Sequence, residues 1–428
     1  MNVRLGVSDP SWEVVFSDKG SSLSLSYDGI PIDYFDEEGR LIGSYAGGRH
    51  YRRGLDNSLL CKHREPGGAQ HVRGAVDGSE KRDIIGSAYS RAESVLKAVK
   101  DGNIGGLRSL DLNPVPYQAV ERITERLELI ISCTWDRLEA DGQQFSKVFA
   151  PVGILPPDQY MALVVQLTSG CSYNRCTFCN FYPGRKFHVK NRDELREHVR
   201  RVIDFMGRSA TLRRSLFISD GNALVIPQTD LIALIRVLEE FFTFPSPEQY
   251  QRERLENPTA MEGIYGFLDG FSTLKKSVDD YKRLASMHLR RVYIGVESGD
   301  NDLLKFLRKP GNAEGMVEAA NTIKAGGVNV GIIIMVGVGG DRYQAQHIRA
   351  TIETVNAMNL GDGDIVYLSD FVNHPGLTYE TLAKEAGITD LVYDELVEQG
   401  RQMRAGFIWD DPVNPPKTAP YDIREFVY

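Results

Sequence analysis

From residue 161 onward, short apolar runs alternate with amphipathic helical patterns, and this alternation constrains the fold more than any other feature of the chain. Helix-capping residues lie between the runs: Asn191 precedes one helical pattern, and Gly326 and Gly327 end another. Strands that alternate with helices form parallel sheets, because each helix returns the chain to the start of the next strand. The pattern therefore predicts an α/β fold with parallel strands, while leaving open whether the sheet closes into a barrel. The apolar runs are 161–167, 215–219, 263–268, 292–296, 330–336 and 364–368.

The residues on either side of this array follow other patterns. Before it, strand-like pieces at 32–35 and 41–45 are followed by a polar, glycine-rich stretch and by helical patterns at 87–100 and around 120–138. A cluster of prolines at 151–157 marks a linker, and two further helical patterns at 379–386 and 392–404 follow the array. We therefore expect an N-terminal α+β domain at 1–157, an α/β core at 158–374 and a short helical C-terminal extension at 375–428.

The composition narrows the class of protein. The chain has 428 residues, of which 42% are hydrophobic and 25% charged, and this balance suits a large buried core. Its 50 Lys and Arg residues against 58 Asp and Glu residues give a net charge of −8, which argues against a nucleic-acid partner. The apolar runs are shorter than a signal peptide or a membrane span requires, so we expect a cytoplasmic protein with no membrane span.

Three of the five cysteines lie within nine residues of one another. Cys171, Cys176 and Cys179 form the pattern C-x4-C-x2-C directly after the first apolar run. Cysteine is the usual ligand of iron–sulfur clusters, and three thiolates can hold three irons of a cubane cluster. The other two, Cys61 and Cys133, are distant in sequence, so the chain supports a single cluster. A site with one protein ligand missing leaves an open metal position, as catalytic zinc sites do.

Two alternatives to an open cluster site remain. His188, nine residues after Cys179, would complete a Cys3His zinc site, and the chain would then be a zinc-stabilised binding module. A cluster that is closed to substrates would instead make the chain an electron-transfer protein. Metal analysis separates zinc from iron, and S-adenosylmethionine cleavage separates an enzyme from an electron carrier.

Residues 161–370 resemble the radical S-adenosylmethionine (radical SAM) superfamily. The cysteine loop carries Phe178 just before its last cysteine, as in that family, although its spacing exceeds the commonest C-x3-C-x2-C by one residue. Three further motifs lie at the ends of later apolar runs, where parallel α/β folds bind ligands. The motif that contains Glu297 is similar to the one found in the coproporphyrinogen-oxidase and Elongator-like branch of the family. In chain order they are Ser219-Asp220-Gly221-Asn222, Gly295-Val296-Glu297-Ser298-Gly299 and Gly337-Val338-Gly339-Gly340.

The resemblance implies a partial (βα)6 TIM-type barrel that binds a 4Fe-4S cluster through the three cysteines and S-adenosylmethionine (SAM) at the bare iron. It implies reductive cleavage of SAM to a 5′-deoxyadenosyl radical, which abstracts hydrogen from, or adds to, an unidentified small-molecule or peptide substrate. The implied partner is an electron donor such as flavodoxin or ferredoxin. The residues that it assigns to SAM are Phe178, Asp220, Gly221, Asn222, Glu297, Ser298, Gly337 and Val338.

Other polar residues near the strand ends are candidates for the substrate site, and the sequence assigns no catalytic residue. A strand-end salt bridge is the alternative role for Glu297, and a solvated loop charge is the alternative for Arg185. In the N-terminal part, Arg49, Tyr51, Arg52 and Arg53 form a cluster that suits a phosphate or carboxylate, but a solvated strand edge is the interpretation that we favour there. The substrate candidates are Arg185, Tyr265, Asp269, Tyr367 and Asp370.

Overall fold

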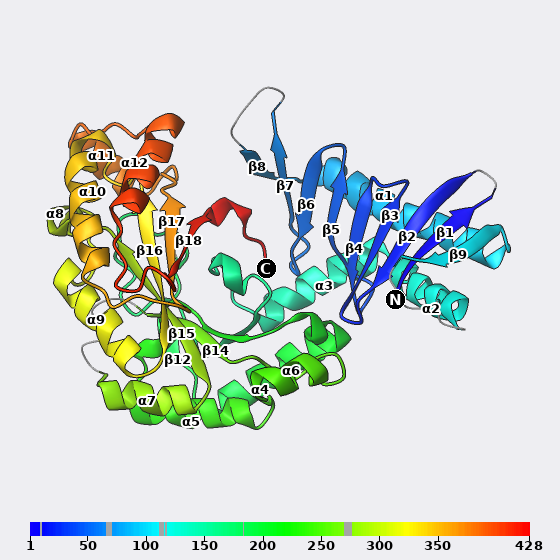
Figure 1. The fold of residues 1–428 in the computed structure, drawn as a ribbon, viewed down its shortest axis with the longest axis horizontal. Helices are drawn as coiled ribbons and strands as arrows, with labels where there is room; N and C mark the ends of the chain where they lie inside the picture. The colour runs from blue at the N-terminus through cyan, green and yellow to red at the C-terminus, as the bar shows by residue number, and fades with distance from the viewer. Residues whose placement is uncertain (9–10, 66–70, 111–114, 116–117, 183, 269–275) are drawn as a thin grey trace.

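The computed structural model describes residues 1–428 except 9–10, 66–70, 111–114, 116–117, 183 and 269–275. Two large sheets dominate the chain and lie beside each other, with the C-terminal segment running between them (Figure 1). The first sheet is formed by the N-terminal residues and is antiparallel, and the second is formed by the later residues and is parallel. The predicted combination of an α+β part and an α/β part is therefore confirmed.

The N-terminal sheet has nine antiparallel strands. One face is buried, as β3 shows, where Leu23, Leu25 and Tyr27 are buried and alternate with half-buried serines. Helices α1 (Gly78–Lys100) and α2 (Ala119–Ile131) cover that face and share a hydrophobic cluster with it. In spatial order the strands are β8 (His71–Ala75), β7 (Leu59–Arg64), β6 (Arg49–Arg53), β5 (Leu41–Ala46), β4 (Ile32–Asp36), β3 (Ser22–Tyr27), β2 (Trp12–Asp18), β1 (Asn2–Val7) and β9 (Ile104–Ser109).

One helical prediction in this part differs from the structure. The pattern around 120–138 forms two helices, because three residues separate the end of α2 at Ile131 from the start of α3 (Trp135–Val148). The side chain of Thr134 accepts a hydrogen bond from the backbone N–H of Arg137, which caps the start of α3. The apolar spacing continues across the break, so periodicity alone does not show it.

The second sheet has seven parallel strands that follow one another in chain order. Its first six strands are the six predicted apolar runs, and nearly every residue of β16 is buried, as expected for a parallel strand covered on both faces. The sheet runs from β10 at one edge to β18 at the other, which makes it a partial barrel. The strands are β10 (Leu163–Gln166), β13 (Leu216–Ser219), β14 (Ile264–Leu268), β15 (Leu289–Glu297), β16 (Asn329–Val336), β17 (Ile365–Asp370) and β18 (Lys417–Tyr421).

Helices return the chain between successive strands and lie along the outside of the sheet (Figure 1). The first of them begins where the sequence indicates, because Asn191 and Glu194 form a reciprocal capping box. In chain order the helices are α4 (Arg192–Met206), α5 (Gln228–Glu239), α6 (Pro247–Glu253), α7 (Val278–Ser286), α8 (Asn301–Phe306), α9 (Ala313–Ala325) and α10 (Gly340–Asn356). In the part of the chain that the structure describes, no helix has both the length and the apolar character needed to cross a membrane.

The C-terminal residues contain the two predicted helices, α11 (Thr378–Glu385) and α12 (Tyr393–Gly406), and also the strand β18. After β18, residues 421–428 connect the two sheets. Glu425 accepts hydrogen bonds from Lys62 and Arg73 of the N-terminal sheet, each at 2.7 Å, and Asp422 lies 3.3 Å from Arg73. This C-terminal segment therefore holds the N-terminal sheet and the partial barrel together by half-buried ion pairs.

Candidate cofactor and active site

A cavity of about 200 Å³ opens at the carboxyl ends of the parallel strands. The cysteine loop forms one side of it, and five of the seven strands and the turn after a sixth form the other. Ligands bind at this end of parallel α/β folds because the loops there are free to carry functional side chains. The lining residues that belong to the strands or follow them directly include Gly221, Asn222, Phe267, Leu268, Gly295, Glu297, Ile333, Met335, Ser369, Asp370, Phe371, Val372 and Tyr421.

The cysteine loop is closed at its base by a two-stranded ribbon, β11 (Thr168–Ser169) paired with β12 (His188–Val189). Within the loop, the backbone N–H of Asn174 donates to the Cys171 sulfur at 3.4 Å, and the backbone N–H of Cys179 donates to the Cys176 carbonyl at 3.3 Å. Hydrogen bonds to sulfur stabilise the thiolate form and tune a metal bound to it. The loop thus provides the first element of a thiolate site.

The middle of the loop is anchored to two neighbouring helices. Thr177 donates to the carbonyl of Leu307, at the end of α8, through both its backbone N–H (3.0 Å) and its hydroxyl (3.3 Å). Its own carbonyl accepts from the backbone N–H of Tyr379 in α11 at 3.0 Å. Phe178 packs against a small hydrophobic cluster that contains Val338. These contacts fix the positions of the cysteines on either side of Thr177.

The turn after β13 packs directly against the cysteine loop. A Cβ atom at Gly221, whose φ is +27°, would lie 2.6 Å from the Gly170 carbonyl oxygen and 2.8 Å from the Cys171 Cα, so the position has no room for a side chain. The Asp220 carboxylate is buried and lies 2.7 Å from the Arg185 guanidinium. Burial raises the pKa of Asp220, while Arg185 opposes that shift. Asp220 and Arg185 therefore brace the loop from behind the cavity wall.

At the end of β15, the chain bulges between Gly295 and Glu297, and Glu297 has a left-handed φ of +61°. The bulge turns the Glu297 carboxylate toward Lys309, whose Nζ lies 2.9 Å away. Both side chains are 10% exposed, and both line the cavity. The strand-end salt bridge and the position in the cavity, which the sequence presents as alternatives, occur together.

The donor set of this cavity fits a cluster bound by three cysteines. All three thiols are free of disulfides and line one wall. Burial raises the pKa of Cys176 to about 12 and also raises that of Cys179, while the Lys309 ammonium acts in the opposite direction on both. Metal binding requires thiolates, so a nearby cation and hydrogen bonds to sulfur are the features that such a site needs.

His188 does not complete a four-ligand zinc site. Its side chain is 57% exposed on β12, and its Nε2 lies 3.2 Å from the Glu194 carboxylate. It is also absent from the residues that line the cavity. Among the described residues, no group of three or more His, Cys, Asp or Glu side chains is arranged to hold a single metal ion.

Comparison with known families identifies the stretch that contains this site. Residues 165–355 match the family model of the Radical SAM superfamily. The chain contains a radical SAM domain. The match runs from β10 into α10, and therefore includes the three cysteines, the turn after β13 and Glu297. No curated protein sequence matches the chain.

Solved structures that are similar to this chain include three with 13% or 15% sequence identity. The cobalamin-dependent radical enzyme OxsB with aqua-cobalamin is 13% identical, with 74% of this chain and 39% of that chain covered and a TM-score of 0.37. Elp3 of Methanocaldococcus infernus is 13% identical, with coverages of 60% and 56% and a TM-score of 0.38. Coproporphyrinogen III oxidase (HemN) from Escherichia coli is 15% identical, with coverages of 61% and 55% and a TM-score of 0.37. The chain thus spans about two fifths of OxsB and a little over half of the other two.

Four of the residues that the resemblance assigns to SAM lie behind the cavity wall: Asp220, Ser298, Gly337 and Val338. The Ser298 hydroxyl lies 2.7 Å from Nδ1 of His347 and accepts from the backbone N–H of Asp300 at 3.0 Å. The backbone N–H of Gly337 donates to the Gln399 side chain at 2.6 Å, and Val338 is fully buried. Ser298, Gly337 and Val338 shape the wall without lining it, and Phe178, Gly221, Asn222 and Glu297 line it.

Of the substrate candidates, too, some line the cavity and others do not. Asp370, at the end of β17, lines the cavity. The Tyr367 hydroxyl donates to Asp158 at 2.6 Å, and Tyr265 is the second residue of β14, so both lie toward the amino-terminal ends of the strands and away from the cavity. Asp269 lies outside the described residues.

Several residues that line the cavity belong to no motif that is recognisable in the sequence. Lys309 lies in the connection after α8, and His374 belongs to the His-Pro-Gly turn that reads as the end of the array. Tyr421 and Ile423 come from the C-terminal residues, which the sequence places in a helical extension. The spacing of apolar residues predicts where strands end, but it does not predict which loops fold back over those ends.

Proposed function

We propose that this chain is a radical SAM enzyme that binds one 4Fe-4S cluster through Cys171, Cys176 and Cys179 and binds SAM in the adjoining cavity. The observation that carries the proposal is the convergence of three free cysteines, which lie in the matched residues 165–355, and the tips of parallel strands on one cavity. Three cysteine ligands leave one position of a cubane cluster open, as a cofactor that must be reached by a small molecule requires.

When bound and reduced by a donor such as flavodoxin or ferredoxin, the cluster and SAM together supply a 5′-deoxyadenosyl radical that abstracts hydrogen from, or adds to, an organic substrate. The chain's own residues hold the thiolates and keep water away from that chemistry. The bonds to the Cys171 sulfur and to the Cys176 carbonyl set the loop geometry, and Lys309 offsets negative charge beside Cys176. Phe267, Leu268 and other apolar lining side chains exclude water.

We assign the SAM contacts to the residues that line the cavity, namely Phe178, Gly221, Asn222 and Glu297. Asp220 supports these contacts from behind, through its ion pair with Arg185. We place the substrate near Asp370, on the side of the cavity formed by β17 and β18. The substrate is a small molecule or a peptide whose reacting carbon reaches this mostly apolar wall.

Anaerobic reconstitution with iron and sulfide tests the proposal. The protein should bind about four irons and four sulfides per chain, and with SAM and dithionite it should release methionine and 5′-deoxyadenosine. Changing Cys171, Cys176 and Cys179 together to Ala should abolish both. Cys61→Ala and Cys133→Ala are matched controls, because both thiols lie in the hydrophobic cluster of the N-terminal sheet, and they should change neither.

Three results would count against the proposal. Iron retained by the triple variant would mean that the motif is misassigned. Stoichiometric zinc without iron uptake would favour a binding module. S-adenosylhomocysteine as the sole product from SAM would indicate ordinary methyl transfer.

A further inference from the structure

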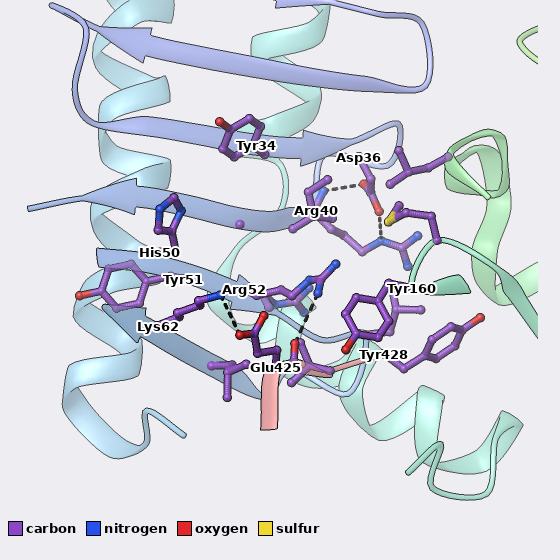
Figure 2. Close-up of a pocket in the computed structure, with 18 of the residues that line it drawn as sticks. Tyr34, Asp36, Arg40, His50, Tyr51, Arg52, Lys62, Tyr160, Glu425 and Tyr428 are labelled. Atoms are coloured by element: carbon purple, nitrogen blue, oxygen red, sulfur yellow. Dashed lines mark hydrogen bonds and ion pairs between the residues drawn. The ribbon is translucent and has the colours of Figure 1, made fainter. Parts of the chain in front are cut away.

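A second cavity, of about 550 Å³, lies between the N-terminal sheet and the partial barrel (Figure 2). One wall comes from β4 to β8, and the other comes from residues that precede β10 and β13 together with the C-terminal segment. It therefore lies toward the amino-terminal ends of the barrel strands, opposite the cysteine loop. The residues that line it are all different from those that line the cysteine cavity. Its volume is within the range of sites for small molecules and cofactors.

The cavity is strongly cationic although the chain as a whole is acidic. Five Lys or Arg side chains and two carboxylates line it. Both carboxylates are already engaged: Asp36 lies 2.8 Å from Arg40, and Glu425 lies 2.7 Å from Lys62. Figure 2 shows these two pairs at opposite ends of the cavity, with Arg52 between them. Positive charge is therefore left over in the middle of the cavity.

Of the three cations that remain, Arg53 donates to the Asn57 side chain and the Leu41 carbonyl. Arg52 and Arg213 provide the excess charge from opposite walls. Arg52 belongs to β6 and Arg213 lies just before β13. Within the described ranges, neither guanidinium has a carboxylate at ion-pair distance. Burial and the nearby charge of Arg213 both lower the pKa of Arg52. Arginine does not lose its proton under such conditions, so two like charges face each other across the cavity.

Each of these guanidinium groups lies over a tyrosine ring. The Arg52 guanidinium is 4.9 Å from the ring centre of Tyr160, and the Arg213 guanidinium is 4.9 Å from that of Tyr428. Stacking holds the plane of the guanidinium and leaves its N–H edges to donate sideways, which is the geometry that carboxylates and phosphates accept.

The hydrogen bonds that Arg52 and Arg213 already make do not use all of their N–H donors. Arg52 donates to the Glu425 carbonyl at 3.4 Å, and Arg213 donates to the Ala162 carbonyl at 3.5 Å. Arg213 is 9% exposed, and its Nε makes no hydrogen bond among the described residues. Buried cationic donors without partners cost free energy, and a bound anion removes that cost.

We propose that this cavity binds a small organic anion whose phosphate or carboxylate group lies between Arg52 and Arg213. Tyr34 on β4 and His50 on β6 also line the cavity and give the organic portion of the ligand flat surfaces to contact. The proposal assigns a binding role to the Arg-rich strand β6, which the sequence alone favours as a solvated edge. It is independent of the chemistry at the cysteine loop.

Titration of the full chain with pyrophosphate and with citrate tests this proposal. Each is compared with sodium chloride at equal ionic strength, by calorimetry and by thermal unfolding, since an anion that binds only the folded state raises the melting temperature. At least one of the two should bind more tightly than chloride. Preference for pyrophosphate identifies a phosphate ligand, and preference for citrate identifies a carboxylate ligand.

The variants locate the binding site. Arg52→Met and Arg213→Met should each weaken binding at least tenfold, and Arg52→Lys should recover only part of it because the paired N–H edge is lost. Arg49→Met is the matched control, since Arg49 lies on the same strand but is exposed and does not line the cavity, and it should bind as the parent does. The triple cysteine variant should also bind normally, whether or not the proposed cluster chemistry is correct.

Equal binding of all three anions, or tight binding that survives in both Arg52→Met and Arg213→Met, would overturn the proposal. If Arg213→Met fails to fold, Arg52→Met decides the question, because Arg52 is half-buried at the cavity wall whereas Arg213 is buried. Loss of anion binding in the triple cysteine variant would place the anion in the other cavity and would also overturn it.

Discussion

The ion pair between Glu297 and Lys309 allows a structural role to be separated from a ligand-binding role. The pair spans 2.9 Å, and each side chain is 10% exposed. Removing one member of a buried ion pair leaves the other charge uncompensated, at a cost of about 3–5 kcal/mol. Because both side chains keep some contact with solvent, we expect the lower end, about 3 kcal/mol, for Glu297→Ala and for Lys309→Met.

The double variant Glu297→Ala with Lys309→Met removes both charges and leaves neither uncompensated. It should therefore be more stable than the sum of the single effects predicts, with a coupling on the order of 1–3 kcal/mol. Thermal and urea unfolding of the four proteins gives this coupling. A coupling near zero would refute the view that the two side chains stabilise each other.

SAM affinity is the second readout of the same variants. If the Glu297 carboxylate contacts SAM, Glu297→Ala should weaken SAM binding at least tenfold, about 1.4 kcal/mol, at unchanged iron content. Glu297→Gln should do less harm if hydrogen bonding rather than charge is what matters. Lys309→Met is the control, because it breaks the same ion pair and keeps the carboxylate. Anaerobic calorimetry on reconstituted protein measures the affinities.

The outcome that would remove Glu297 from the SAM site is specific. Glu297→Ala would melt at a lower temperature, as Lys309→Met does, and would bind SAM as tightly as the parent. In that case the carboxylate serves only to anchor the end of β15. The assignment of the three cysteines would stand.

Three further predictions follow from contacts around the barrel. Gly221→Ala should destabilise the protein by about 1–3 kcal/mol and lower iron uptake, because the new Cβ meets backbone of the cysteine loop, and normal iron content would contradict this. Asp220→Asn leaves Arg185 without its charged partner, so iodoacetamide should alkylate the cluster-free loop cysteines faster, whereas Asp193→Asn on exposed α4 should not change that rate. Burial lowers the pKa of His347 to about 4. The contribution of neutral His347 to stability is therefore complete above the ordinary pKa near 6.5 and is lost as the pH falls toward 4. Urea unfolding across this range should show the loss, and His347→Gln should make the free energy of unfolding less dependent on pH.

The strands and the cysteine loop are predictable from sequence for a simple physical reason. A parallel strand covered on both faces is a continuous apolar run, and the runs at β15 and β16 contrast sharply with the polar helix surfaces between them. Strand β18 lacks that signal, because its residues, Lys417 to Tyr421, include a proline and pair with only one neighbour at the sheet edge.

The contacts of the site are less predictable, because they depend on where loops return. The bulge at Glu297 and its pairing with Lys309 join residues on either side of α8, and no spacing rule links them. The sequence does not predict that the Tyr367 side chain points away from the cavity, because its hydrogen-bond partner, Asp158, precedes the first strand of the barrel. Periodicity gives the position of a residue along a strand, but the level it occupies in the barrel depends on tertiary packing.

The C-terminal segment gives the two cavities a common wall. Tyr421 and Ile423 line the cysteine cavity, and a few residues later Glu425 and Tyr428 line the cationic one. A displacement of this segment by a ligand on one side therefore changes the shape of the cavity on the other. Thermodynamic linkage makes such an effect reciprocal: an anion that alters the affinity for SAM by a given factor must have its own affinity altered by SAM by the same factor.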